Sequence, residues 1–223
     1  AARREAVELC QRQYAEAALG WRQAADRTRD DPQGAGQRLG ALSQALVDTT
    51  PVVPDEFRDV RALVVGGSRG LGAAAVQLLA AGGADVRFTY HRGAADAARV
   101  AAAAPGATAH HLDVLEAAGL DSISADGWRP TLVAWFASPP IFVGARDACS
   151  ESLHDRFRSV YVDAFLRTVE RLGADTLAAI LWPSSEAVTT DAAGLAEYAD
   201  AKRIGEQACR ELGNTRIVTF GRV

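Results

Sequence analysis

A short unit near residues 61–90 constrains the fold of this chain more than any other feature. The apolar run 62–65 suits a strand buried on both faces, and glycines follow it at positions 66, 70 and 72. An alanine- and leucine-rich stretch to residue 81 is typical of a helix, and two glycines stop it before a second strand at 84–90. The order strand, glycine turn, helix, strand predicts one unit of a parallel α/β sheet.

The glycine turn also indicates a binding site. Glycines let the backbone approach a pyrophosphate, and the N-terminus of the following helix supplies free N–H groups and a positive dipole. Arginine suits the 2′-phosphate of NADPH, whereas NAD prefers an acidic residue, so Arg69 in the turn and Arg92 after the second strand favour NADPH. The alternatives are glycines that serve only close packing and arginines that are merely solvated.

The chain has a single lysine among its 24 basic residues, four positions after a tyrosine in the run YADAK. Apolar residues recur at helical spacing over 195–212, so Tyr198 and Lys202 are expected on one helix face, about 5–6 Å apart at Cβ. An ammonium there lowers the cost of forming phenolate, which favours Tyr198 as a general acid with a lowered pKa. The alternative is a solvated lysine on a surface helix.

Four motifs in this order make residues 61 to 221 resemble a short-chain dehydrogenase/reductase. The glycine motif of that family matches GGSRGLG at 66–72, and its acidic residue after the third strand matches Asp113 in HHLDV. Its catalytic tyrosine and lysine match Tyr198 and Lys202. The resemblance implies a Rossmann-type fold and hydride transfer from a nicotinamide.

The resemblance also implies roles for individual residues. The family's serine, thirteen positions before the tyrosine, falls on Ser185 in WPSSEAV, with Ser184 as the fallback. Tyr198 would protonate a carbonyl oxygen that Ser185 holds, while Lys202 would hold the nicotinamide ribose. Asp113 would contact the adenine, although it also suits a helix N-cap, and Ser185 also suits an ordinary strand end or turn. The cofactor contacts implied are Gly66, Ser68, Arg69, Gly70, Leu71, Gly72, Arg92, Asp113, Val114 and Lys202.

The chain departs from the family where a proton relay is expected. The family carries asparagines after its fourth strand and in the following long helix, where one helps to hold a water beside the lysine. This chain has one asparagine, Asn214, too late in the sequence to serve. Ala137 and Ser138 occupy the turn instead, and Tyr161 and Asp163 are the candidates to replace the helix asparagine.

Composition excludes several classes of protein. The 223 residues are 48% apolar and 23% charged, as in a globular enzyme, and a net charge of −4 without a basic run offers nothing to nucleic acid. No apolar stretch reaches about 18 residues and no signal peptide is recognisable, so we expect a cytoplasmic protein that neither spans a membrane nor is secreted. Three widely spaced cysteines suit free thiols in a reducing compartment.

Metal and hydrolase chemistry are also disfavoured. His110 and His111 are adjacent on an expected strand, where successive side chains point to opposite faces, so they cannot chelate one metal together. No histidine lies near Ser184 and Ser185, and their surroundings are not those of a nucleophile elbow. We therefore expect no metal site.

The first 58 residues are expected to form a helical hairpin and a linker. Apolar residues from Val7 to Ala24 recur in steps of three and four, DDPQGAG breaks the pattern, and 37–47 resumes it before the stiff segment TTPVVPDE. The hairpin either packs on the domain formed by residues 59–223 or docks a neighbouring domain. The chain has no methionine and ends where a sixth strand would, with Phe220 and Gly221 on the family's Pro-Gly turn, so we expect a C-terminally truncated piece of a longer protein.

The fold expected is α/β, a Rossmann-type doubly wound parallel sheet with an N-terminal helical extension. Helices at 151–172 and 195–212 would form the dimer contact of the family, which implies a homodimer or homotetramer. The strands are expected near 61–66, 84–90, 107–112, 131–137, 175–182 and 215–220.

These features together predict an NADPH-dependent short-chain dehydrogenase/reductase that reduces a ketone to an alcohol. By analogy, the excised character of the chain and its richness in alanine and arginine favour a ketoreductase domain acting on a carrier-bound or small β-keto substrate in a biosynthetic assembly. The alternative is a catalytically degenerate domain of the same fold that binds cofactor or serves as a scaffold.

Overall fold

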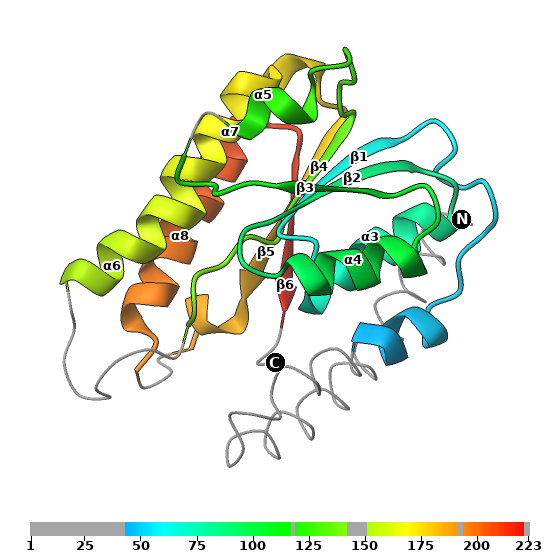
Figure 1. The fold of residues 1–223 in the computed structure, drawn as a ribbon. Helices are drawn as coiled ribbons and strands as arrows, with labels where there is room; N and C mark the ends of the chain where they lie inside the picture. The colour runs from blue at the N-terminus through cyan, green and yellow to red at the C-terminus, as the bar shows by residue number, and fades with distance from the viewer. Residues whose placement is uncertain (1–42, 117–118, 142–150, 191–193, 221–223) are drawn as a thin grey trace, which may run out of the picture.

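A sheet of six parallel strands forms the centre of the molecule (Figure 1). The computed structural model describes residues 43–116, 119–141, 151–190 and 194–220. The strand order is β3-β2-β1-β4-β5-β6, and each neighbouring pair is parallel. The predicted α/β doubly wound sheet is therefore confirmed. The strands are β1 (Arg61–Val65), β2 (Asp85–Tyr90), β3 (Thr108–His111), β4 (Leu132–Trp135), β5 (Ala179–Ser185) and β6 (Thr215–Phe220).

Helices cover both faces of the sheet, as Figure 1 shows. On one face α3 (Gly70–Ala81) and α4 (Ala94–Ala103) enclose a core that includes Val64, Val76 and Phe88. On the other face lie α6 (Glu151–Arg158), α7 (Ala164–Leu172) and α8 (Ala196–Leu212), over a larger core with Trp135 and Trp182. Apart from Arg61, the central strands β1 and β4 are apolar, because both of their faces are buried. Short helices complete the chain: α5 (Leu120–Ile123), η3 (Ala174–Thr176) and η4 (Glu186–Val188).

The long helix expected over residues 151–172 contains a π-helical turn. The segment η2 (Ser159–Asp163) joins α6 to α7 and buries Val160, Tyr161 and Val162. A π turn inserts one residue into the helical repeat and so turns side chains to faces that an unbroken α-helix would not give them. The sequence pattern did not predict this turn, which brings Tyr161 into the interior.

The fifth strand was placed wrongly by sequence. It was expected near 175–182 and runs instead from Ala179 to Ser185, because η3 and its turn occupy residues 174–176. Ser184 and Ser185 therefore belong to the strand rather than to the turn after it. Among the described residues, no helix is both long and apolar enough to cross a bilayer.

The N-terminal extension is described only from residue 43. Residues 43–49 form a helix, and residues 54–59 form turns before β1. The expected first helix of the hairpin and the start of the second lie outside the described residues. In Figure 1 the helix at 43–49, in blue, lies below α3 and α4, and the chain then climbs the right-hand side of the sheet.

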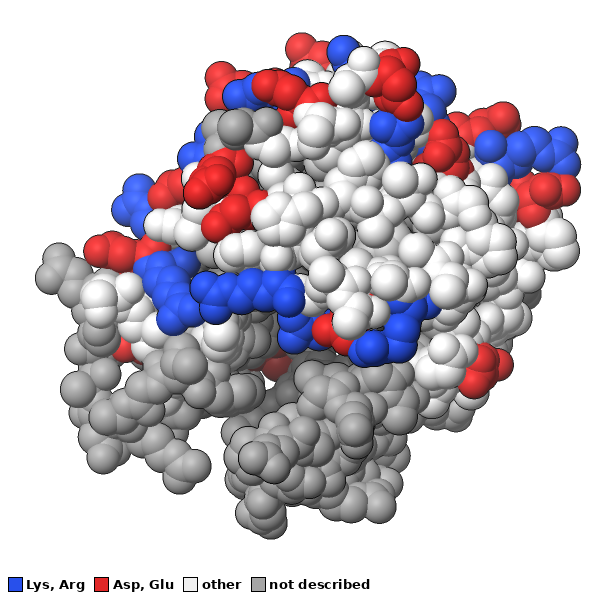
Figure 2. All heavy atoms as spheres, viewed as in Figure 1, with Lys and Arg blue, Asp and Glu red and all other residues white. Residues whose placement is uncertain are grey.

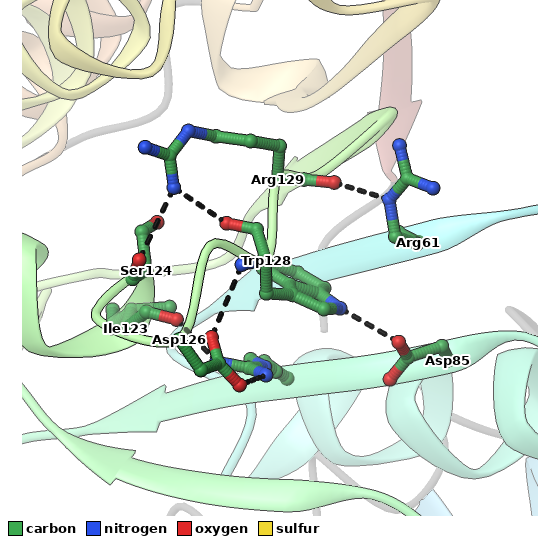
Figure 3. Close-up of polar contacts among 8 residues, drawn as sticks. Arg61, Asp85, Ile123, Ser124, Asp126, Trp128 and Arg129 are labelled. Atoms are coloured by element: carbon green, nitrogen blue, oxygen red, sulfur yellow. Dashed lines mark hydrogen bonds and ion pairs between the residues drawn. The ribbon is translucent and has the colours of Figure 1, made fainter.

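A cluster of polar contacts connects the N-terminal ends of β1 and β2 to the loop before β4 (Figure 3). The indole Nε1 of Trp128 donates to Oδ2 of Asp85 at 2.7 Å, and the guanidinium of Arg87 lies 4.6 Å from the centre of the indole ring. Arg87 also hydrogen-bonds Asp126 and thereby lowers the pKa of that carboxyl to about 2. Arg61 Nε donates to the carbonyl of Arg129, so the loop before β4 is tied to both β1 and β2.

Candidate functional site

The residues expected to act lie at the carboxyl ends of the parallel strands. In the observed sheet order β1 lies beside β4, and the chain proceeds to opposite edges of the sheet from these two strands. Loops that leave two such neighbouring strands in opposite directions open a crevice, and this is where sheets of this type bind ligands. The glycine turn after β1, Ser138 after β4 and Ser185 at the end of β5 all lie at this edge.

The glycines of the turn divide into two kinds. A Cβ at Gly72 would lie 2.2 Å from the carbonyl oxygen of Gly66, so this glycine is required for close packing, as the alternative interpretation held. Gly70 has φ of +55°, and a Cβ there would meet nothing within 4 Å. Among the residues that the structure describes, no side chain caps the N-terminus of α3, which begins after Arg69. The turn thus combines open space with uncapped N–H groups, which an anionic group can satisfy.

The two arginines expected to contact a 2′-phosphate differ in their surroundings. Arg69 Nε lies 2.9 Å from Oδ2 of Asp96, which also pairs with Arg99, while Arg92 lies exposed after β2. Figure 2 shows basic side chains forming a band across the lower part of the face drawn. Because Asp96 already holds Arg69, a phosphate would have to share this guanidinium with a carboxylate.

Asp113 has a defined local role. Its Oδ1 accepts from the backbone N–H of Leu115 at 3.0 Å, but residues 114–115 form a turn rather than a helix, so Asp113 is not the helix N-cap weighed as the alternative. Its Oδ2 lies 3.5 Å from Nε2 of His91. The ring of His91 packs edge-on against that of His111. The carbonyl of Val114 accepts from Arg167 at 2.9 Å, and Ser68 and Leu71 are half-buried in and after the glycine turn.

The two serines of WPSSEAV contact different residues of α8. Ser184 donates to Oε1 of Glu206 at 2.5 Å, and Glu206 in turn accepts from Arg210. Ser185, the last residue of β5, instead hydrogen-bonds Tyr198, and it accepts from the N–H of Ala187 at 3.2 Å. Of the two serines, Ser185 is therefore the one paired with the tyrosine.

Lys202 is enclosed by aromatic rings. Its Nζ lies 4.0 Å from the ring centre of Tyr161 and 4.3 Å from that of Trp182, and it donates to the carbonyl of Pro183 at 2.7 Å. The side chain is 5% exposed, and burial lowers its pKa from 10.5 to about 7, against smaller opposing effects of Cys209 and Glu206. Cation–π contacts and one carbonyl thus surround an amine that titrates near neutrality.

Tyr198 does not have the lowered pKa that the sequence suggested. Burial raises the pKa of its phenol above 10.0, and the hydrogen bond with Ser185 opposes that effect. The Nζ of Lys202 is 5.9 Å from the Tyr198 ring centre, and its carbonyl partner and two nearer rings hold it elsewhere. The two side chains share a helix face as expected, but in this arrangement burial outweighs the ammonium. Tyr198 therefore keeps its proton at neutral pH.

Of the two candidates for the missing asparagine, Tyr161 lies in the site and Asp163 does not. The hydroxyl of Tyr161 lies 2.5 Å from Oγ of Ser138, and its ring packs edge-on against Tyr198. Asp163 is exposed and lies 3.8 Å from Arg158 on the outer side of the helix. Burial raises the pKa of Tyr161, so it too is a neutral phenol.

Sequence reasoning did not single out Trp182 or His91, and it named Ser138 only as an occupant of the turn. Gly205, a glycine inside the helix α8, was the signal in the sequence that a large side chain packs closely on that helix. The structure shows that this side chain is Trp182, because a Cβ at Gly205 would lie 2.4 Å from its indole. The described residues contain no group of three or more His, Cys, Asp or Glu side chains that could hold a metal ion.

Comparisons with known proteins agree with this geometry. No protein-family model matches the chain, and no curated protein matches it. Among solved structures, BdcA in complex with NADPH is 26% identical with a TM-score of 0.61 and covers 73% of this chain and 70% of its own. A short-chain dehydrogenase/reductase from Serratia marcescens is 25% identical with a TM-score of 0.61 and covers 73% of each chain.

A third similar structure is an oxidoreductase of E. coli, yciK, at 19% identity, with a TM-score of 0.65 over 77% of this chain and 80% of its own. This last likeness bears on the fold alone. The similarity to the first two structures agrees with four features of this protein: the succession of βαβ units, the glycine turn, the pair of Ser185 and Tyr198, and the lysine of YADAK. In sequence and in fold the chain is therefore similar to the short-chain dehydrogenase/reductases.

Proposed function

We propose that this protein reduces a ketone to an alcohol with NADPH, using Tyr198 as the general acid. The observation that carries the proposal is the pairing of Tyr198 with Ser185 at the carboxyl edge of the sheet, while Ser184 is bound to Glu206. A neutral phenol and a serine hydroxyl that face each other can both donate a hydrogen bond to one carbonyl oxygen. The oxidoreductase neighbours support the same chemistry.

The residues of the turn fit a dinucleotide phosphate. Gly70 leaves open space that a side chain would fill, α3 starts without a side-chain cap, and Arg69 and Arg92 supply positive charge near the ends of β1 and β2. We expect the pyrophosphate at this turn, the adenine near Asp113 and the 2′-phosphate beside the arginines. NADPH, when bound, supplies the hydride.

The raised pKa of Tyr198 fits the role of a general acid in reduction. A phenol that stays protonated at neutral pH has a proton to give as negative charge develops on the carbonyl oxygen, whereas oxidation of an alcohol would need the phenolate as base. Ser185 would orient the oxygen and stabilise its developing charge. Ser138 is exposed and contacts Tyr161, so these two hydroxyls would lead from solvent toward the aromatic enclosure of Lys202.

The substrate class proposed is a β-keto compound, either small or bound to a carrier within a larger biosynthetic assembly, in a protein that forms a homodimer or homotetramer. A similar structure at 22% identity, provisionally named a betaketoacyl-ACP reductase, shares the fold. The N-terminal extension gives the chain a segment beyond the sheet that neighbouring domains or a second copy could contact.

A second candidate function rests on the enclosure of Lys202. An amine that is 5% exposed and held by the carbonyl of Pro183 is poorly placed to reach a nicotinamide ribose, which favours a domain that binds cofactor or serves as a scaffold without turnover. Only a movement of the aromatic side chains or of the lysine itself would free the ammonium.

A titration followed by a turnover assay separates these functions. NADPH and NADH are titrated in parallel at one ionic strength, followed by nicotinamide fluorescence, and then a β-keto ester or thioester is added. The reductase predicts preferential NADPH binding and turnover that Tyr198→Phe and Ser185→Ala abolish, whereas Ser184→Ala keeps it. Binding without turnover supports the scaffold, and binding of neither nucleotide refutes both.

A further inference from the structure

The described part of the N-terminal extension contacts the glycine turn directly. Ser43, only 3% exposed, donates its hydroxyl to the carbonyl of Gly70 at 2.9 Å. These residues are 27 positions apart in sequence, and Ser43 precedes the first strand of the sheet. A residue outside the βαβ unit therefore holds the turn on which the proposed function depends.

A second contact fixes the same segment at the other end of α3. The backbone N–H of Phe57 donates to the carbonyl of Gly82 at 2.7 Å, and a Cβ at Gly82 would lie 2.4 Å from the Phe57 ring. The helix α3 has 12 residues, which corresponds to about 18 Å. The segment from Ser43 to Phe57 thus reaches both ends of α3, and we call it the α3 strap.

The direction of the Ser43 contact determines its effect. Carbonyl groups of a helix point toward its C-terminus, whereas the free N–H groups of the first turn point the opposite way. The hydroxyl of Ser43 therefore binds the carbonyl of Gly70 and uses none of the N–H groups of the first turn. Gly70, with φ of +55° and no neighbour within 4 Å of its Cβ position, lacks side-chain packing of its own to fix its conformation. A glycine is also the most conformationally free residue.

We propose that Ser43 is a positioning residue for the cofactor-binding turn, so that the N-terminal extension sets the affinity for the dinucleotide. The inference rests on the proposed function, because it assumes that NADPH phosphates bind at Gly70 and the start of α3. Holding the turn before the ligand arrives removes an ordering cost from binding. Loss of one hydrogen bond of ordinary strength should weaken NADPH binding by about threefold to tenfold.

The test compares three variants of the whole chain. Ser43→Ala removes the hydroxyl, Ser43→Thr keeps one, and Thr49→Ala is the control, because Thr49 lies in the same helix and bonds only within it, to the carbonyls of Ala45 and Leu46. The dissociation constant of NADPH, the melting temperature and amide hydrogen exchange over residues 66–73 are measured for each. Exchange is measured without nucleotide, so it reports on the turn even if no cofactor binds.

The proposal expects Ser43→Ala to weaken NADPH binding and to speed exchange at residues 66–73 relative to exchange in β5. Ser43→Thr should restore both, and Thr49→Ala should change neither. Unchanged exchange in Ser43→Ala, or faster exchange throughout the protein together with a lower melting temperature, would overturn it. If the unaltered protein fails to bind NADPH while Ser43→Ala speeds local exchange, the proposed function fails but the positioning of the turn stands.

Discussion

The buried amine of Lys202 should make the stability of this protein rise with pH just above neutrality. Burial lowers its pKa from 10.5 to about 7 in the folded chain, whereas in the unfolded chain it keeps the ordinary value. Between those two pH values the unfolded state binds more protons than the folded state. The free energy of unfolding therefore increases with pH across this window, and below about pH 7 the dependence on Lys202 disappears.

The magnitude follows from the two pKa values. The slope approaches about 1.4 kcal/mol per pH unit once the folded amine is neutral, and integration from about pH 7 to about pH 8.5 gives about 1.5 kcal/mol. The upper limit avoids Cys209, because burial raises the pKa of that thiol to about 12 and its effect above about pH 9 has the opposite sign. The raised pKa of Tyr161 acts at still higher pH.

The assay is urea unfolding at both ends of the pH window for the unaltered protein and for Lys202→Met, which retains length without charge. The unaltered protein should gain about 1.5 kcal/mol more than the variant as pH rises. Arg203→Met is the matched control, because Arg203 is an exposed base on the same helix and should leave the pH dependence unchanged. Equal pH dependence in Lys202→Met and in the unaltered protein would refute the enclosed, easily deprotonated lysine.

Four further changes test the site and the fold. Tyr198→Phe should slow ketone reduction by about 100-fold to 10,000-fold with little change in the dissociation constant of NADPH, and retained turnover would exclude it as the acid. Gly70→Ala should cost about 1–2 kcal/mol of stability, measured by urea unfolding, because an alanine there must keep a left-handed backbone conformation. It should also weaken NADPH binding, because the new Cβ enters the open space beside the turn. Gly72→Ala should instead prevent folding, seen as lost circular dichroism, since its Cβ meets a carbonyl oxygen at 2.2 Å. Trp128→Phe should lower the free energy of unfolding by about 1 kcal/mol in urea, because Asp85 loses its indole partner, and an unchanged midpoint would contradict that contact.

The fold could be predicted from sequence because its signals are local. A fully apolar strand, a glycine turn and an alanine-rich helix each follow from the residues that form them, and their alternation specifies a parallel sheet. The sixth strand was predicted at its observed residues, 215–220. The fifth was displaced because η3 occupies residues 174–176, where the strand was expected to begin, and a helix this short leaves no periodic pattern in the sequence.

Parts of the candidate site were also accessible from sequence. The spacing of Tyr198 and Lys202 placed both on one helix face, and α8 at Ala196–Leu212 puts them there. The choice between Ser184 and Ser185 could not be made from adjacent positions alone. It depends on which residue of α8 each serine meets, and the contacts of Ser184 to Glu206 and of Ser185 to Tyr198 decide it.

The sequence by itself determined which residues can do chemistry, since a phenol, an amine, a serine and a glycine turn at set spacings are properties of the chain. Only the tertiary structure decided their electrostatic states. Tyr161 and Trp182 come from different elements to enclose Lys202, and that burial lowers one pKa while the same interior raises that of Tyr198. Ser43 likewise meets Gly70 only after folding. Desolvation depends on atoms brought together from distant parts of the sequence, and no local pattern records it.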